Sequence, residues 1–300
     1  MAMDRRDFVI GGSVLGATLL AAVGSRTAAQ KSQPNGPAEL KLSSQDGVIP
    51  GAALAQKVAK MAAWGMQGLE VGGGGLPGRV AEIKRALEGT PIKVSAICAG
   101  YASCLLADAA EERRKCVASM KEILTAAGEL GSTGLIVVPA FNGQSNLSNR
   151  EARPILVDLL REVGDHAQRC GTRLLLEPLN RGEAFFLRQL ADAASICRDV
   201  NNPGVGMMGD FYHMYIEETS DLGAFLSAGQ YLHHVHLASR RRVLPGQDDR
   251  SFVGGFRGLQ MIGYRDFCSF ECGVEGDREV EIPKALAFLR NQWREAEAMT

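Results

Sequence analysis

Four acidic or imidazole side chains each follow a short apolar run in the second half of the chain. They are Glu177 after residues 174–176, Asp210 after 205–209, His236 after 232–235, and Glu271 after 267–270. Such runs are typical of buried strands, where a carboxylate stays charged only beside a metal, a cation or hydrogen-bond donors. Three carboxylates and one imidazole suit a single Mn²⁺, Mg²⁺ or Co²⁺ better than a metal that prefers thiolates.

The spacing of these four residues indicates one rim of a closed barrel. The intervals from 177 to 210, 210 to 236 and 236 to 271 are 33, 26 and 35 residues. A (β/α)8 barrel of about 250 residues uses roughly 31 residues for each strand and its helix. We therefore expect the four side chains at the C-terminal ends of strands 5, 6, 7 and 8.

Short apolar runs and helical patterns alternate along the rest of the chain as well. Residues 40–44, 68–71, 94–99 and 134–139 predict the first four strands. Helices are expected at 52–64, 79–87, 109–130, 152–170, 187–200, 221–228 and 282–298. The polar segment after the seventh strand, with Pro245 and Gly246, is expected to be a loop that covers substrate. Without a GxGxxG fingerprint, the pattern predicts an α/β fold, a single (β/α)8 TIM barrel over residues 38–300.

Composition narrows the class of partner. The 300 residues carry a net charge of −1 and show no long basic run, which argues against nucleic acid. The seven cysteines follow no CxxC or disulfide spacing. We interpret all of them except Cys104, which we leave open, as small core residues. A homo-oligomer is compatible with the sequence, which does not specify one.

The first 29 residues resemble a twin-arginine signal peptide. Arg5 and Arg6 precede a weakly apolar stretch, residues 8–23, which is too short for a stable span of about 20 residues. Small residues follow at 27–29, and residues 30–37 are polar and are expected to form a flexible lead-in. We expect no membrane span after processing, and a mature protein that is periplasmic or secreted.

Four motifs around the strand-end residues resemble a known family. They are Glu-Pro-Leu-Asn-Arg-Gly-Glu at 177–183, Asp-Phe-Tyr-His-Met at 210–214, His-Val-His at 234–236 with Arg242, and Phe-Glu at 270–271. In this order they resemble the sugar isomerase/epimerase branch of the xylose-isomerase-like barrels, especially ketose 3-epimerases and hydroxypyruvate isomerases. The resemblance covers about residues 40–294. It implies Glu177, Asp210, His236 and Glu271 as ligands of one divalent cation, and His213, Arg242 and Glu183 as residues that bind a sugar.

The chemistry of such a site is proton transfer beside a carbonyl. A divalent cation on adjacent oxygens of a keto-sugar acidifies the neighbouring C–H and stabilises an enediolate. Glu177 and Glu271 are the expected catalytic pair, one removing the proton and the other returning it. Return to the same carbon gives epimerisation, and return to its neighbour gives aldose–ketose isomerisation. His213 and Arg242 would polarise or anchor hydroxyl groups.

Three other functions compete with this interpretation. A metal-dependent lyase would remove the C2 proton of a 3-keto-glycoside and expel the C1 substituent by β-elimination, which suits an exported protein. A non-catalytic sugar-binding barrel is the second alternative. Apurinic-site endonucleases share the barrel but need a histidine-rich cluster of several metals. Here the first histidine is His166 and none follows His236, so one metal is favoured.

Three further polar residues near the expected rim have less certain roles. Strand alternation directs His234 inward beside His236, as a packing or supporting residue, and directs His233 outward. Glu70, near the end of the second strand, is open between binding substrate and pairing with a basic residue.

We predict that the exported protein lacks the signal peptide and begins close to residue 30. Cleavage follows from the small residues at 27–29, which suit a signal peptidase. Intact mass and N-terminal sequencing of the exported fraction would measure the start. An exported chain that still carries residues 1–29 would contradict the prediction.

Overall fold

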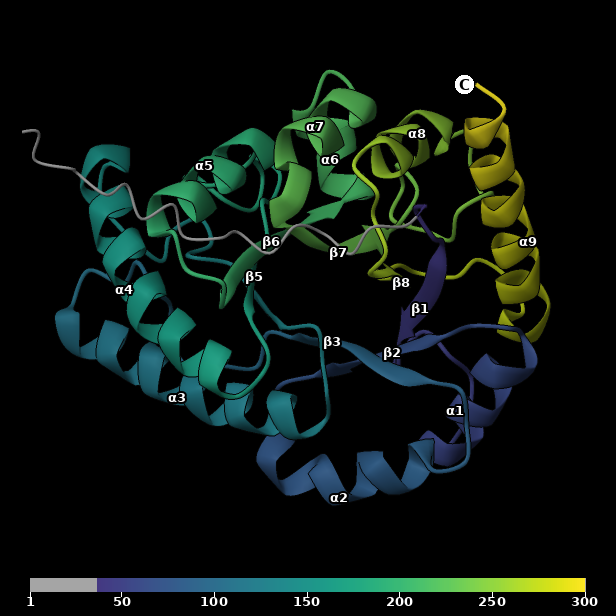
Figure 1. Cartoon of the computed structure of the whole chain (residues 1–300), viewed down its shortest axis with the longest axis horizontal. Helices are drawn as coiled ribbons and strands as arrows, with labels where there is room; N and C mark the ends of the chain where they lie inside the picture. The colour runs from purple at the N-terminus through teal and green to yellow at the C-terminus, as the bar shows by residue number, and fades with distance from the viewer. Residues whose placement is uncertain (1–36, 300) are drawn as a thin grey trace, which may run out of the picture. The chain divides into compact units, whose positions relative to one another are not determined.

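Eight parallel strands close into a barrel in the part of the chain that the computed structural model describes, residues 37–299 (Figure 1). The strands are β1 Lys41–Gln45, β2 Gly68–Gly72, β3 Lys93–Cys98, β4 Leu135–Val137, β5 Leu174–Leu176, β6 Val205–Asp210, β7 Leu232–Leu237 and β8 Phe267–Phe270. Each pairs with the next in chain order, and β8 pairs with β1, where Ser43 lies opposite Ser269. The predicted TIM barrel is confirmed. The predicted signal peptide and most of the lead-in lie outside the described residues.

Helices surround the ring of strands (Figure 1). They are α1 Leu54–Ala63, α2 Leu76–Leu87, α3 Ala110–Glu129, α4 Asn149–Arg169, α5 Leu190–Val200, α6 Phe211–Glu217, α7 Asp221–Ala228, α8 Val253–Met261 and α9 Arg278–Glu297, with a short 3-10 turn at Gly229–Tyr231. Within residues 37–299 we find no helix with the length and apolar character needed to cross a bilayer. All seven cysteines lie in this part of the chain, and none is paired.

The inside of the barrel has an apolar part and a polar part. Ala96, Ile136, Leu175 and Met208, one from each of β3 to β6, form a small core separate from the layer between strands and helices. The buried polar residues of the other strands are Ser43, Ser44, Glu70, His234, His236 and Ser269. Buried polar groups require partners, so β1, β2, β7 and β8 carry most of the polar network of the barrel, which Ser95 of β3 joins by a hydrogen bond to Ser43.

Two helices were not expected from the sequence. Helix α6 begins directly after β6, where Oδ1 of Asp210 accepts a hydrogen bond from the Tyr212 amide at 2.7 Å. Helix α8 lies in the segment after β7 that the sequence suggested was a loop. Three of its nine residues are glycines, which weaken the helical signal. Two of them, Gly255 and Gly258, lie close against Phe211 and Leu222, so packing stabilises a helix that propensity does not favour.

Helix α8 also completes an aromatic cluster behind the end of β6. The Phe211 ring lies 5.4 Å from that of Phe225, 4.7 Å from Phe252 and 6.0 Å from Phe256. Aromatic rings at these distances pack favourably in tilted or edge-to-face arrangements. Because Phe211 follows Asp210 directly, this cluster holds in place the backbone that carries the aspartate.

Replacing Gly255 by alanine should destabilise the protein by about 1–3 kcal/mol, the usual effect of overpacking a core. The added Cβ would lie 2.5 Å from Cζ of the buried Phe211 ring. Gly254→Ala is the matched control, because no atom of the described residues lies within 4 Å of its added Cβ. Its stability should be unchanged or raised by up to about 1 kcal/mol. Urea unfolding of both variants measures the difference, and equal stabilities would contradict this packing.

Candidate metal centre

Glu177, Asp210, His236 and Glu271 converge at one rim of the barrel. Each offers a ligand atom within 4.8 Å of the others. Glu177 and Glu271 follow β5 and β8 directly, Asp210 ends β6, and His236 is the penultimate residue of β7. Since all eight strands are parallel, their C-terminal ends meet at the same rim. The structure therefore brings together the four residues that the spacing had placed there.

The Nδ1 atom of His236 lies at the middle of this cluster. It is 3.6 Å from Oε1 of Glu177, 3.8 Å from Oδ2 of Asp210 and 3.2 Å from Oε2 of Glu271. Neither this nitrogen nor Oδ2 of Asp210 makes a hydrogen bond within the described chain, although both are buried. Buried polar atoms without partners are rare in native proteins. Two such atoms that face one another, in an oxygen-rich set, fit a divalent cation.

The charges of the cluster act on one another strongly. Burial raises the pKa of Glu177, and the nearby charge of Glu271 raises it further. Burial also acts on Glu271, but the nearby charges of His236 and Arg242 lower its pKa to about 2. Burial would lower the pKa of His236, yet Glu70 and Glu271 raise it well above its usual value. Concentrated negative charge is thus the main property of this site.

A second group of residues borders the cluster on its open side. Nη2 of Arg242 donates to Oε2 of Glu271 at 2.8 Å, and its Nη1 lies 3.5 Å from Oε1 of Glu183. The side chains of Glu271, Arg242 and Glu183 are 19%, 34% and 37% exposed. Solvent therefore reaches the cluster from this side.

His213 lies on the same side, with a defined tautomer. The Asn180 amide donates to its Nδ1 at 3.2 Å, so Nδ1 accepts and the neutral ring carries its proton on Nε2. That Nε2 is 3.7 Å from Oδ2 of Asp210. The side chain of Asn180 also donates to Oε1 of Glu183 at 2.9 Å, which links the two predicted sugar-binding residues. All seven predicted site residues thus form one contiguous group.

The structure also shows which of three consecutive arginines faces the site. Arg240 and Arg241 pair with the exposed side chains of Asp249 and Glu275. Arg242 has a φ of +55°, a left-handed conformation that is uncommon outside glycine. The turn directs its guanidinium over the Tyr212 ring, 4.8 Å from the centroid.

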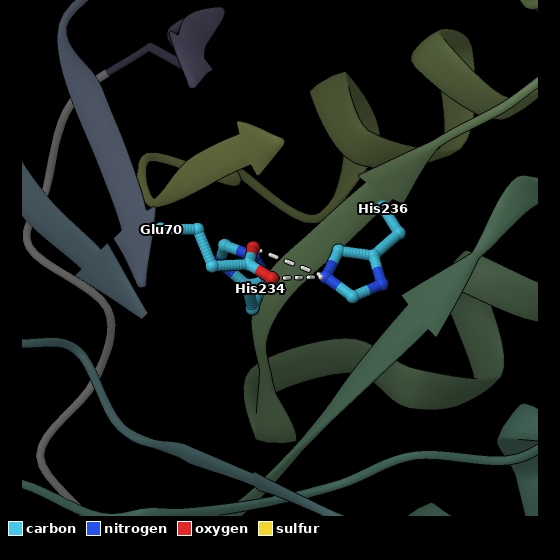
Figure 2. A group of neighbouring side chains, drawn as sticks. All are labelled: Glu70, His234 and His236. Carbon is cyan, nitrogen blue, oxygen red and sulfur yellow. Dashed lines mark hydrogen bonds and ion pairs between the residues drawn. The ribbon is translucent and has the colours of Figure 1, made fainter. Parts of the chain in front are cut away.

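Sequence reasoning missed several residues that support this site. Asn180 and Tyr212 lie within two of the four motifs but were assigned no role, and Gln45 carries no signal in the sequence pattern. The sequence did not decide the role of Glu70. Its side chain is fully buried and accepts hydrogen bonds from His234 and His236 of β7 (Figure 2). The inward direction of His234 is confirmed, and His233 points away, 2.9 Å from Asp266. The acid on the second strand and the alternation of histidines on the seventh were the sequence signals that could have predicted this contact.

Comparison with known proteins agrees with the barrel fold. Residues 58–292 match a family described as the xylose isomerase-like TIM barrel. The 3-dehydro-D-guloside 4-epimerase of Escherichia coli (strain K12) is 33% identical over 237 residues, which cover 75% of this chain and 90% of that protein. The D-psicose 3-epimerase of Ruminiclostridium cellulolyticum is 36% identical over 108 residues, 36% of this chain and 37% of that one.

Solved structures share the fold over nearly the whole barrel. The apo 3-keto-D-glucoside 4-epimerase from E. coli has a TM-score of 0.79 and 29% identity, covering 84% of this chain and 100% of that chain. The D-psicose 3-epimerase of Clostridium cellulolyticum H10 has a TM-score of 0.78 at 22% identity, covering 85% and 99% of the two chains. The second likeness concerns the fold alone.

Proposed function

Because the chain belongs to the xylose isomerase-like TIM barrel family, we propose that it is a metal-dependent sugar epimerase acting beside the carbonyl of a keto-sugar. The chain is an enzyme of the isomerase class, and sugar epimerisation is the activity that its relatives support. The observation that carries the proposal is the convergence of three carboxylates around Nδ1 of His236, where two buried atoms make no hydrogen bond within residues 37–299.

The relatives favour a 3-keto-glycoside as the substrate class. The 3-dehydro-D-guloside 4-epimerase aligns with 75% of this chain, whereas the D-psicose 3-epimerase aligns with 36%. A 3-keto-glycoside has an acidic C–H at C4, next to the carbonyl, where epimerisation would take place. A free ketose with an acidic C–H at C3 is the second choice.

The four ligand residues would hold the cation, which when bound would polarise the substrate carbonyl and increase the acidity of the neighbouring C–H. Glu177 and Glu271 come from strands three positions apart in the ring, so their carboxylates approach the cluster from different directions. One removes the proton from one face of the carbon, and the other returns a proton to the opposite face. The product has the composition of the substrate and the opposite configuration at that carbon.

The bordering residues position the sugar. The proton on Nε2 of His213 is a donor for a sugar oxygen, because Asn180 already occupies Nδ1. The guanidinium of Arg242 is held by Glu271, Glu183 and the ring of Tyr212, which limits its freedom before substrate arrives. A donor positioned in advance loses little conformational entropy on binding and stabilises negative charge on the substrate oxygens.

The N-terminal sequence bears on where the enzyme is located in the cell. Residues 1–29 lie outside the described residues, and we propose on their sequence that the mature enzyme is periplasmic or secreted. A 3-keto-glycoside carries no phosphate and is therefore a reasonable substrate outside the cytoplasm. A homo-oligomer stays a prediction.

We predict that each chain binds one divalent cation and that Glu177→Gln weakens this binding. The loss of Mn²⁺ affinity should exceed the roughly 10–100-fold that removal of an outer hydrogen-bond partner costs. Glu183→Gln is the matched control, since Glu183 lies six residues after Glu177 and is not one of the four ligand residues. Titration calorimetry measures both variants. Equal affinities for Mn²⁺ would contradict the assignment of Glu177 as a ligand.

We predict that Mn²⁺-loaded enzyme in D2O places deuterium at C4 of an aryl 3-keto-glucoside and forms its 4-epimer. Glu177→Gln and Glu271→Gln should lower this rate by about 10²–10⁴-fold, the usual contribution of a general acid or base. Glu275→Gln, four residues beyond Glu271 and 53% exposed, should leave the rate unchanged. NMR and mass spectrometry follow the exchange.

Two other outcomes of this assay would overturn the assignment of epimerase activity. Release of the aryl aglycone without a 4-epimer would assign the lyase reaction by β-elimination. Binding of metal and sugar with neither exchange nor release would assign a sugar-binding barrel.

A further inference from the structure

We propose that Glu70 is a positioning residue that keeps a proton on Nε2 of His236 and so presents the unprotonated Nδ1 to the metal. The inference rests on the proposed function only in that it takes His236 as a metal ligand. It concerns two strands, β1 and β2, that contribute none of the four ligands.

The carboxylate of Glu70 contacts both histidines of β7, and it meets the His236 ring on the edge opposite the four-residue ligand cluster. Both of its oxygens are 3.1 Å from Nε2 of His236, and Oε2 is 2.8 Å from Nε2 of His234. Figure 2 shows this carboxylate directed at the His236 ring, with both oxygens joined to it. All three side chains are fully buried, so water does not compete for these hydrogen bonds.

This contact determines which nitrogen of His236 carries the proton. An ionised carboxylate can only accept hydrogen bonds, so the Nε2 that it contacts must donate. A neutral imidazole protonated on Nε2 has its lone pair on Nδ1, and Nδ1 is the atom that faces Glu177, Asp210 and Glu271. A carboxylate behind a metal-bound histidine commonly fixes the tautomer and the ring orientation in this way.

His234 supports Glu70 and does not reach the metal cluster. Its Nε2 donates to Glu70, while its Nδ1 is buried without a partner in the described chain. A second N–H donor helps a buried carboxylate to remain ionised.

Gln45 extends the same support to a second ligand. Its side-chain amide donates to Oε1 of Glu70 at 2.9 Å and to Oε1 of Glu271 at 2.9 Å. An amide has two N–H groups, so one Gln45 side chain serves both carboxylates. Glu70 therefore orients His236 directly, and through Gln45 it is linked to the position of Glu271.

The same three residues admit a second interpretation. Glu70, His234 and His236 offer ligand atoms within 4.8 Å of one another and could hold a second ion. Two observations favour positioning. Both oxygens of Glu70 already receive N–H donors, and a second ion would have to displace the proton of His236. The number of ions bound per chain distinguishes the two.

The first test measures the Mn²⁺ affinity of Glu70→Gln in the full mature chain by titration calorimetry. We expect a loss of about 10–100-fold, the usual cost of removing an outer partner of a ligand. His234→Gln should cost less, since His234 acts only through Glu70. Ser95→Ala is the control, because Ser95 is buried in the barrel but bonds to Ser43 instead. An unchanged affinity in Glu70→Gln, or two ions per native chain, would overturn the proposal.

The second test uses the native protein, and so it decides the matter even if Glu70→Gln fails to fold. ¹⁵N NMR of histidine side chains in the Mg²⁺-loaded enzyme should show His236 protonated on Nε2 only. A proton on Nδ1, or none on Nε2, would overturn the proposal. Neither readout depends on turnover. Loss of the epimerase assignment with both results as expected would leave the role of Glu70 intact.

Discussion

Mutual repulsion among three carboxylates is the constraint on which this rim of the barrel depends. Glu177, Asp210 and Glu271 each approach Nδ1 of His236 to between 3.2 and 3.8 Å. Their ligand oxygens lie within 4.8 Å of one another, and buried like charges this close cannot all remain ionised unless something compensates them. The chain supplies part of that compensation through Arg242 and Gln45 on Glu271. A divalent cation, as proposed above, would supply the rest of the compensating positive charge.

The barrel interior has an apolar part and a polar part, and the polar part supplies hydrogen-bond partners near these carboxylates. Apart from Ser95 and Asp210, strands β3 to β6 fill their part with apolar side chains, which pack without needing partners. Strands β1, β2, β7 and β8 bury serine, glutamate and histidine side chains instead. Such a network is favourable only where donors and acceptors match, and here Glu70 accepts from His234, His236 and Gln45. The polar part of the core therefore belongs to the function of the protein as much as to its fold.

Tertiary packing also explains where sequence patterns misled. The segment 253–261 contains three glycines and has no strong helical signal, yet it forms α8. Gly255 and Gly258 allow that helix to approach Phe211 and Leu222 more closely than any larger residue could. The benefit comes from contacts with α6 and α7, which no local propensity encodes. The same packing holds the residue after Asp210, so an overlooked helix supports a ligand that was expected.

The sequence by itself determined the barrel, its eight strands and the four strand-end residues. Those features are local, because apolar runs, their spacing and the acid or imidazole after each run can be read along the chain. Only the tertiary structure decided the residues that support them. Gln45 is 226 residues from Glu271, and Glu70 is 166 residues from His236. They meet because closure of the barrel pairs β1 with β8 and places β2 across from β7, and such contacts leave no periodic trace in the sequence.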